Sequence, residues 1–387
     1  MQRCGSKRGK CSGMVLLLAV EAASALEWEP VVEPYDQIFP ALELATATMR
    51  SEPSDDATVL GDPDSLIGAQ ITAERDHQQV RLEVEAPRLM RTSIFEGELP
   101  RRGQTYTVYP SIAWNFEALA AFRQPAPEVL EMRLTVDGKA LTRKLAKVRI
   151  RSVNDALYWV GDAEEGSALD FNWLFAAYVN EDHPLVDRIL KEALETGIVE
   201  SFSGYQDEDP DAVYRQVFAI WYVLQRHGIR YSSITRTSSA SDNVLSQYVR
   251  FIDQSWENTQ ANCVDGTVLF ASVMRKIELD PLLVMVPEHA FLGFALDAEG
   301  REFAYLETTL LGARAEKGQG SLAHITAQLP RAARIRASFR NFEAAVENAT
   351  AQVDEAGQKF NDEAQVDYQM VDIQQSRELG VMPIVPR

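Results

Sequence analysis

Alternating apolar and polar residues dominate the chain from residue 26 to about residue 152. The segment 78–86, QQVRLEVEA, has valine or leucine at alternate positions with charged residues between them. A second alternating run, 130–136, leads into Asp137-Gly138, and a third run covers 147–153 with Arg151 on its polar face. The second and third runs predict a hairpin with an Asp-Gly turn. Several short strands of this kind predict a β-sandwich domain over residues 26–152.

Helical and strand patterns are mixed between residues 153 and 311. Apolar stripes that begin near a proline and end at a glycine predict helices, and short apolar runs between turn residues predict strands. The predicted helices are 183–197, 211–228 and a helix from Cys263 onward; the predicted strands are 229–235, 247–257, 281–286 and the two arms of a hairpin over 290–309. Helices combined with an antiparallel sheet predict an α+β domain over 153–311.

The C-terminal segment, residues 312–387, contains one long helical pattern. Its apolar residues are spaced alternately four and three positions apart: Ile335, Phe339, Phe342, Val346, Ala349, Val353, Ala356 and Phe360. This heptad seam predicts a long helix. Two interpretations are open: the seam packs against the body of the same chain, or it pairs with a second copy in a homodimer through the 335–360 helix.

The first 25 residues differ from the rest of the chain. They combine a basic start, a short apolar run (MVLLLAV, 14–20) and the small residues Ala23-Ser24-Ala25, which is the pattern of a secretory signal peptide over 1–25. We therefore expect a periplasmic or secreted protein; the alternative is a basic tail on a cytoplasmic protein. The sequence contains no run of about 18 apolar residues, so stable membrane insertion is not expected.

Charge and cysteine content narrow the classes of function. The formal net charge is −19, and no basic, aromatic stretch offsets it, so we expect no nucleic-acid partner. Cys4 and Cys11 would leave with the signal peptide, so Cys263 is the one thiol of the mature chain. A lone thiol in an oxidising compartment is a liability unless it is buried or used. The histidines lack metal-ligand spacing, so we expect no metal and no other cofactor.

Cys263 stands at the start of a predicted helix, in the segment NCVDGTVLFASVM at 262–274. Asn262 is a favoured N-cap residue, which would put Cys263 in the first helical position. The positive end of the helix dipole and the unpaired backbone N–H groups there favour the reactive thiolate, and the same groups can stabilise an oxyanion. Gly266 would let another element approach the helix closely. The alternative is a buried, inert cysteine.

A nucleophilic cysteine needs a base and an orienting partner, and His289 and Glu307 are the candidates. His289 begins one arm of the predicted hairpin, and Glu307 lies in the other, mostly apolar arm. If residues 298–300 form the turn, Phe291 lies opposite Glu307, and His289 and Glu307 are diagonal neighbours on one face, within side-chain reach. A loop one residue longer or shorter would put them on opposite faces.

Three segments in this order, NCVDGTVLFASVM, VPEHAFLGFAL and LETT, resemble the transglutaminase-like superfamily, and GIRYSSIT and FAAYVNEDHP resemble its extended, exported bacterial form. The resemblance covers roughly residues 170–311. It implies a papain-type α+β fold in which Cys263 is the nucleophile, His289 the base and acid, and Glu307 the orienting acid. Two residues depart from the family pattern. Glu307 stands where aspartate is commoner, and Glu288 stands where many relatives have glycine, so its carboxylate could raise the pKa of His289 or block a substrate path.

Gln254, Trp256 and Gln260 precede the cysteine and are candidates for completing the oxyanion hole; the sequence does not choose between them. The resemblance implies a cysteine protease or amidase, or an acyltransferase that uses an amine, acting on a protein or peptide substrate through a thioester on Cys263. Hydrolysis is favoured because water is always present. The alternative is a catalytically degenerate scaffold that serves as an envelope protein-binding module.

Overall fold

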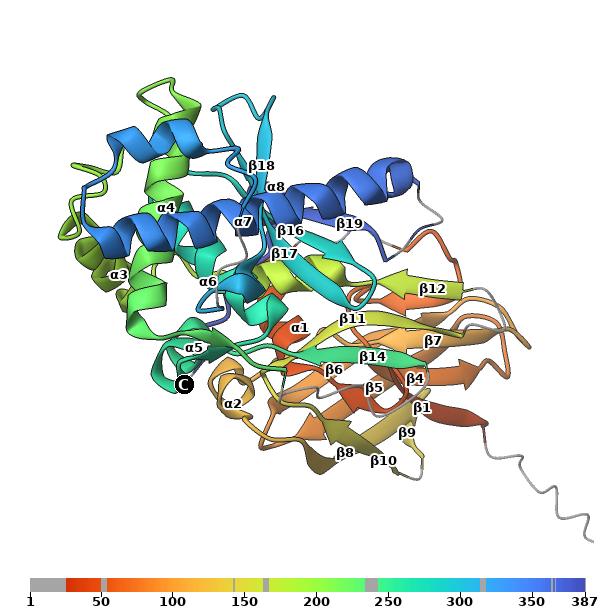
Figure 1. Cartoon of the computed structure of the whole chain (residues 1–387). Helices are drawn as coiled ribbons and strands as arrows, with labels where there is room; N and C mark the ends of the chain where they lie inside the picture. Colours follow the sequence, from red (N-terminus) through yellow and green to blue (C-terminus); the bar gives the residue numbers. More distant parts are fainter. Residues whose placement is uncertain are drawn as a thin grey trace, which may run out of the picture.

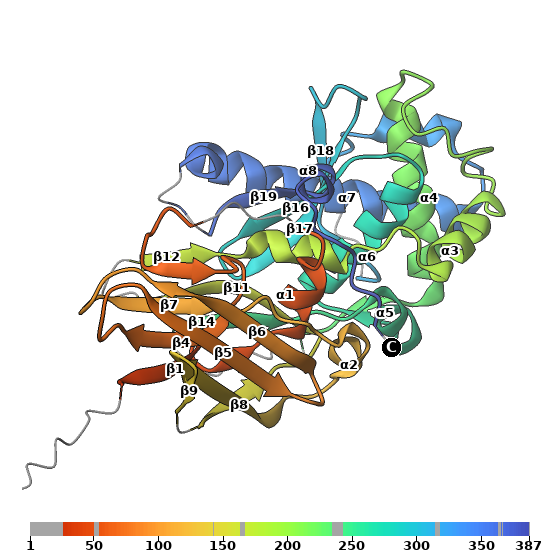
Figure 2. The same cartoon turned by 180° about the vertical axis from the view of Figure 1, so that it is seen from behind.

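The computed structural model describes residues 26–49, 54–141, 143–162, 167–233, 243–313, 318–362, 365 and 367–386 (Figure 1). The predicted signal peptide, 1–25, lies outside the described residues. The structure contains many helices and many strands, and the strands form several separate sheets. The predicted α+β class is therefore confirmed. The strands of the N-terminal part lie in the lower half of Figures 1 and 2, and most of the helices lie above them.

Two sheets share one apolar core in the N-terminal part. The first has the order β1 (Trp28–Val32), β4 (Ile67–Thr72), β7 (Thr105–Tyr109), β3 (Val59–Gly61). The second has the order β2 (Gln37–Ile38), β10 (Lys144–Ile150), β8 (Ala126–Val136), β5 (Gln78–Ala86), β6 (Met90–Leu99), with β9 (Lys139–Ala140) paired to β8. Alternation in β5 buries Val80, Leu82 and Val84 in the shared core. The predicted Asp137-Gly138 turn joins β8 to β9, and both of its residues have positive φ.

Strand β10 leads into a buried ion pair. Arg151, which was expected on the polar face of the strand, is only 5% exposed. Its guanidinium donates to Asp155 Oδ2 at 3.1 Å, Gln37 Oε1 at 3.1 Å and Ser246 Oγ at 3.0 Å. The expectation is wrong because β10 ends at Ile150 and the alternation ends with it. Arg151 therefore links the second N-terminal sheet, through Gln37 of β2, to strands β11 and β14.

The described residues form three further sheets, of two to four strands each. Their orders are β12-β11-β14, β13-β15 and β18-β17-β16-β19. The strands are β11 (Asp155–Asp162), β12 (Ser167–Asp170), β13 (Arg230–Tyr231), β14 (Val244–Tyr248), β15 (Gln260–Ala261), β16 (Pro281–Val286), β17 (His289–Ala295), β18 (Phe303–Leu306) and β19 (Gln369–Asp372). The α-helices are α1 (Pro40–Ala45), α2 (Phe116–Ala121), α3 (Pro184–Leu194), α4 (Pro210–His227), α5 (Ile252–Asn258), α6 (Cys263–Lys276), α7 (Ala333–Ala356) and α8 (Ile373–Glu378). The 3₁₀ helices are η1 (Asn172–Tyr178), η2 (Thr308–Leu310), η3 (Ala323–Gln328) and η4 (Gly357–Asn361).

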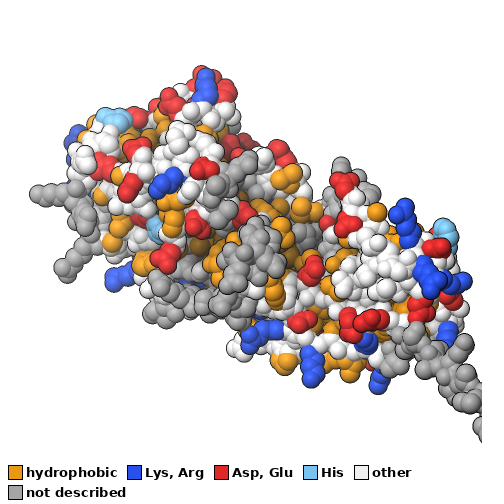
Figure 3. All heavy atoms as spheres, turned by 90° about the vertical axis from the view of Figure 1, so that its right-hand side faces the viewer, with side chains coloured by type: hydrophobic (Ala, Val, Ile, Leu, Met, Phe, Trp, Pro, Cys, Tyr) orange, Lys and Arg blue, Asp and Glu red, His pale blue; other side chains and the backbone are white. Residues whose placement is uncertain are grey.

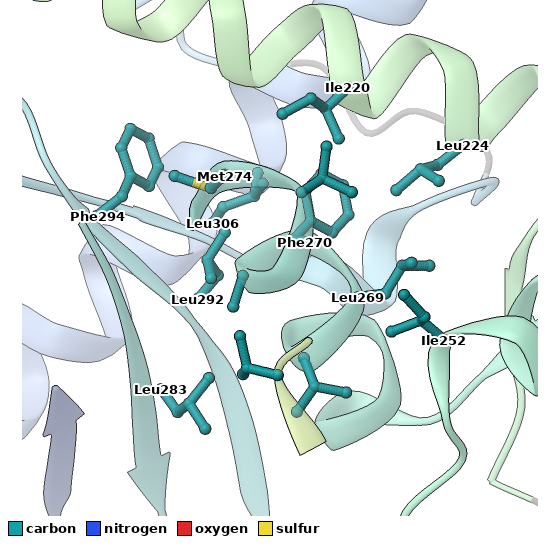
Figure 4. Close-up of a cluster of buried hydrophobic side chains, with 14 of the residues drawn as sticks. Ile220, Leu224, Ile252, Leu269, Phe270, Met274, Leu283, Leu292, Phe294 and Leu306 are labelled. Carbon is teal, nitrogen blue, oxygen red and sulfur yellow. The ribbon is translucent and has the colours of Figure 1, made fainter. Parts of the chain in front are cut away.

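Helix α6 lies in the larger core, between α4 and the sheet that contains β16, β17 and β18 (Figure 4). The labelled side chains in this contact are Leu269, Phe270 and Met274 of α6, Ile220 and Leu224 of α4, and Leu283, Leu292, Phe294 and Leu306 of the strands. All of them are buried. Because each large apolar side chain contributes about 1.5–3 kcal/mol on burial, this core holds α6 firmly against the sheet.

One predicted strand is mostly a helix in the structure. The segment 247–257 was expected to be extended, but α5 begins within it. The buried residues of α5 are Ile252, Ser255 and Trp256, which follow the spacing of a helix rather than of a strand. The apolar residues of this segment fit both the two-residue spacing of a strand and the three-to-four-residue spacing of a helix. The spacing alone therefore did not identify the helix. In the predicted strand 229–235, the described residues form only the two-residue β13.

Helix α7 carries the predicted heptad seam, and this seam is buried against the same chain. Its residues Ile335, Phe339, Phe342, Val346 and Ala349 are all buried. The rings of Phe339 and Phe342 lie 5.0 and 5.5 Å from the ring of Phe218 in α4. The seam therefore packs within the chain. Its buried apolar residues are not available for a homodimer through the 335–360 helix. After α7, β19 pairs antiparallel with β16, so the C-terminal segment also supplies an edge strand.

Two surface properties bear on possible partners. None of the helices in the described part of the chain combines the length and apolarity needed to cross a membrane. On the face shown in Figure 3, acidic and basic side chains are interspersed, and no broad basic patch is visible.

Candidate active site

Cys263 occupies the first position of α6, as the sequence predicts. Asn262 caps the helix: its Oδ1 accepts a hydrogen bond from the N–H of Asp265 at 2.8 Å. In return, Asp265 Oδ2 accepts from the N–H of Asn262 at 2.9 Å, which completes a capping box. The first backbone N–H groups of a helix have no partner within it. The half-buried thiol of Cys263 therefore lies beside unpaired donors at the positive end of the dipole.

A buried ion pair fixes the start of α6. Asp265 has no exposed surface, and its Oδ2 lies 2.7 Å from Arg250 Nη1. Asp265 Oδ1 also accepts from the backbone N–H of Arg250 at 2.7 Å. Burial raises the pKa of Asp265 above its usual value, against the lowering effects of the Asn262 and Arg250 hydrogen bonds. The Asp265 carboxylate thus joins the N-terminus of α6 to the loop between β14 and α5. The sequence analysis did not predict this contact.

Gly266 lets the turn after Glu307 approach α6. A Cβ atom at Gly266 would lie 2.8 Å from Thr308 Oγ1 and 3.1 Å from Thr308 Cβ. Thr308 begins η2 and is buried. The close approach predicted for Gly266 is therefore confirmed, and its partner is the residue next to Glu307. The contact brings the acidic arm of the hairpin to within one helical turn of Cys263.

The hairpin β17–β18 has the predicted register. Leu292 pairs with Leu306 and Ala295 with Phe303, and continuing this register puts Phe291 opposite Glu307. His289 and Glu307 consequently lie on the same face, and His289 Nε2 donates to Glu307 Oε2 at 2.7 Å. The His289 side chain is 26% exposed and that of Glu307 only 4%. The predicted histidine–acid pair is therefore confirmed as a contact.

Glu307 has three further hydrogen bonds that hold its carboxylate in place. Thr309 donates twice to Oε1, through its N–H at 3.1 Å and through its hydroxyl at 2.6 Å. Gln352 of α7 donates to Oε2 through Nε2 at 2.9 Å. Sequence analysis missed Gln352, because the heptad pattern identifies only the apolar face of α7. The long C-terminal helix thus contributes a polar side chain to the site as well as packing.

The surroundings of the site change the pKa values of His289 and Glu307. Burial alone would lower the pKa of His289, but hydrogen bonds to Cys263 and Glu307, together with their charges, raise it from 6.5 to about 10. For Glu307, in contrast, burial alone would raise the pKa. Hydrogen bonds from His289, Thr309 and Gln352 outweigh this effect and hold the pKa below its usual 4.5. The raised pKa therefore keeps His289 protonated at neutral pH, in contact with the Glu307 carboxylate.

Cys263 and His289 both line a cavity of about 280 Å³. The other residues around it are Tyr158, Asn172, Phe175, Leu245, Gln247, Val264, Met285, Val286, Pro287, Glu288, Ala290 and Asp367. Glu288 is exposed, and it is not among the groups that raise the pKa of His289. The prediction that its carboxylate could act on the imidazole is therefore not met. The mostly apolar cavity gives the thiol an open approach from solvent.

The three predicted oxyanion candidates do not line this cavity. Gln254 uses its side-chain oxygen to accept from Phe251 N–H and Asn154 Nδ2 at 3.0 and 2.9 Å. The ring of Trp256 stacks on His227 at 3.5 Å, and Gln260 lies exposed in β15. The prediction is wrong because it rested on closeness in sequence, whereas α5 and β15 direct these side chains to other parts of the structure.

No protein-family model matches the chain, and no curated protein matches it. The function must therefore be argued from the geometry of Cys263, His289 and Glu307.

Proposed function

We propose that this protein is a cysteine acyl-transfer enzyme of transglutaminase-like type, which cleaves an amide or peptide bond through a thioester on Cys263. The observation that carries the proposal is that Glu307 holds His289 by a hydrogen bond, and that His289 and Cys263 line one cavity. A nucleophile, a base and an orienting group in this order are what covalent acyl transfer requires.

In the proposed reaction, Cys263 is the nucleophile, His289 is first the acid and then the base, and Glu307 orients the imidazole. The Cys263 sulfur attacks the carbonyl carbon, and His289 Nε2 stays bonded to Glu307, which leaves Nδ1 for the thiol and the leaving group. As the C–N bond breaks, the imidazolium gives its proton to the departing amine, and a thioester remains on Cys263. Water then attacks the thioester while His289 takes its proton. The C–S bond breaks, which releases a carboxylic acid and returns the thiol.

Hydrolysis is the proposed outcome, with transfer to an amine as the variant of the same chemistry. Both routes share the thioester and differ only in whether water or a primary amine attacks it. A protein or peptide is the proposed substrate, because the cavity is open to solvent and the bond broken is an amide. Adding a primary amine during turnover distinguishes the two routes, since transamidation produces a new amide that mass spectrometry detects.

The alternative, a degenerate scaffold that only binds other proteins, predicts a different geometry. In such a scaffold, Glu307 would turn away from His289 or Cys263 would be fully occluded. Instead, Glu307 accepts from His289 at 2.7 Å, and Cys263 is half-buried and lines the cavity. These observations support the enzyme proposal over the scaffold.

The test is to trap the acyl-enzyme with p-nitrophenyl acetate, a small activated ester. We expect a burst of p-nitrophenolate equal to the protein concentration, and one acetyl group on the peptide that contains Cys263. Cys263→Ser is the matched control, because it changes only the sulfur, and we expect it to give no burst. A burst of the same size in Cys263→Ser, or none in the wild-type protein, would contradict the proposal.

A further inference from the structure

Asn172 is a buried polar side chain that the proposed roles of Cys263, His289 and Glu307 do not use. It begins η1, is 8% exposed, and lines the same cavity as Cys263 and His289. Its backbone N–H donates to Asp170 Oδ1 at 2.8 Å. Within the described residues, its side-chain amide has no hydrogen-bond partner.

The Asn172 amide has no partner among the described residues, and its atoms are not among the fully buried, unpaired polar atoms of the structure. The amide therefore reaches the open space of the cavity that it lines. Asn172 can therefore be understood as a donor that is kept available for a group that enters the cavity. The side-chain amide offers two N–H donors, and a carbonyl oxygen bound next to Cys263 would be a suitable acceptor.

The element that carries Asn172 is held rigidly against the cysteine helix. The N–H of Asn180, just after η1, donates to Ser272 Oγ of α6 at 2.9 Å. The hydroxyl of Tyr178 donates to the carbonyl oxygen of Val153 at 3.0 Å, and Leu174 and Phe175 are buried in the core around α6. Donors that stabilise a developing charge act best when the scaffold already holds them in place.

We propose that Asn172 is a catalytic residue that supplies the side-chain donor of the oxyanion hole, together with the backbone N–H groups at the start of α6. This rests on the proposed acyl-transfer function. As the sulfur adds to the carbonyl carbon, the carbonyl oxygen gains negative charge, and Asn172 Nδ2 donates a hydrogen bond to it. No proton is transferred, and the bond is strongest in the tetrahedral intermediate. Gln247, another amide in the wall, already donates through Nε2 to the carbonyl of Tyr248 at 3.0 Å.

The test compares two reactions of Cys263 in the full-length protein. Acylation by p-nitrophenyl acetate passes through a tetrahedral oxyanion, whereas alkylation by iodoacetamide does not. For Asn172→Ala we expect the acylation rate constant to fall about 10²–10³-fold, the loss typical for one oxyanion donor, with alkylation unchanged. Asn172→Asp, which keeps the shape but replaces the donor by an acceptor, should lose as much. Asn361→Ala, which removes the same side chain from an exposed asparagine outside the cavity, is the control and should change neither rate much.

The possible outcomes separate this proposal from the proposed function. Equal losses in acylation and alkylation would mean that Asn172 has only a structural role, and would overturn the proposal. Unchanged acylation in Asn172→Ala, or an equal loss in the Asn361→Ala control, would also overturn it while the acyl-transfer function stands. Failure of the wild-type protein to form an acyl-enzyme would instead refute the proposed function, and the role of Asn172 with it.

Discussion

Replacing Glu307 by glutamine tests whether this carboxylate sets the charge of His289. The carboxylate accepts four hydrogen bonds, from His289, Gln352 and both donors of Thr309. A glutamine has one acceptor oxygen in place of two and carries no charge. A hydrogen bond to a charged group contributes about 1.5–3 kcal/mol, and one pKa unit corresponds to 1.36 kcal/mol. The pKa of His289, raised to about 10 in the native protein, should therefore fall by about 1–2 units.

Titration of the histidine ring signals by NMR measures this change. The chain has five histidines, and a His289→Asn variant identifies the signal of interest. Glu288→Gln is the matched control, because it removes a carboxylate next to His289 that does not contribute to the raised pKa. We expect Glu307→Gln to lower the midpoint and Glu288→Gln to leave it unchanged. Equal shifts in both variants, or no shift in Glu307→Gln, would refute the reasoning.

The same substitution should change the pH dependence of stability in a defined direction. The raised pKa of His289 stabilises the fold fully below 6.5, and this contribution is lost as the pH rises toward about 10. The lowered pKa of Glu307 stabilises the fold above 4.5, and this contribution is lost as the pH falls through its folded value. In urea unfolding, wild type should exceed Glu307→Gln by the largest margin between pH 4.5 and 6.5. A margin that grows as the pH rises above 6.5 would contradict this assignment.

Three further substitutions test the surroundings of the site. Gln352→Leu removes a donor from the orienting carboxylate, so the acylation rate should fall by about tenfold, the equivalent of 1.36 kcal/mol; an unchanged burst rate would show that the hydrogen bond is dispensable. Gly266→Ala puts a methyl group against Thr308, and the overpacking costs about 1–3 kcal/mol. This cost should exceed the gain of ~1 kcal/mol in helix propensity, so the variant should unfold at a lower temperature than the wild-type protein. Arg250→Met leaves Asp265 buried without its counter-charge, which should cost about 3–5 kcal/mol in urea unfolding; a loss below 1 kcal/mol would show that the pair is not important for the fold.

The sequence predicted the positions of Cys263, His289 and Glu307, because residues close to them in sequence determine these positions. The turn at 298–300 sets the hairpin register, and that register puts His289 and Glu307 on one face. Asn262 likewise identifies the helix start and the place of Cys263. In each case the deciding residues are close together in sequence, and one steric or hydrogen-bonding rule governs them.

The residues that sequence analysis missed reach the site through packing between distant segments. Gln352 comes from a helix whose pattern indicates only its buried side, and Asn172 lies just before the FAAYVNEDHP segment, outside every motif that the sequence offers. Conversely, Gln254 was chosen because it precedes the cysteine, but its side chain caps α5. Closeness in sequence does not indicate which side chains share a cavity, since the packing of separate elements decides this.

The rate at which iodoacetamide alkylates Cys263 at neutral pH tests the central claim most directly. The account predicts that Cys263 reacts much faster in the native protein than in the urea-unfolded chain. It also predicts that His289→Ala removes most of this difference, because the imidazolium next to the sulfur is then lost. Labelling of Cys263 only after unfolding, or equally fast native labelling in wild type and His289→Ala, would contradict the account.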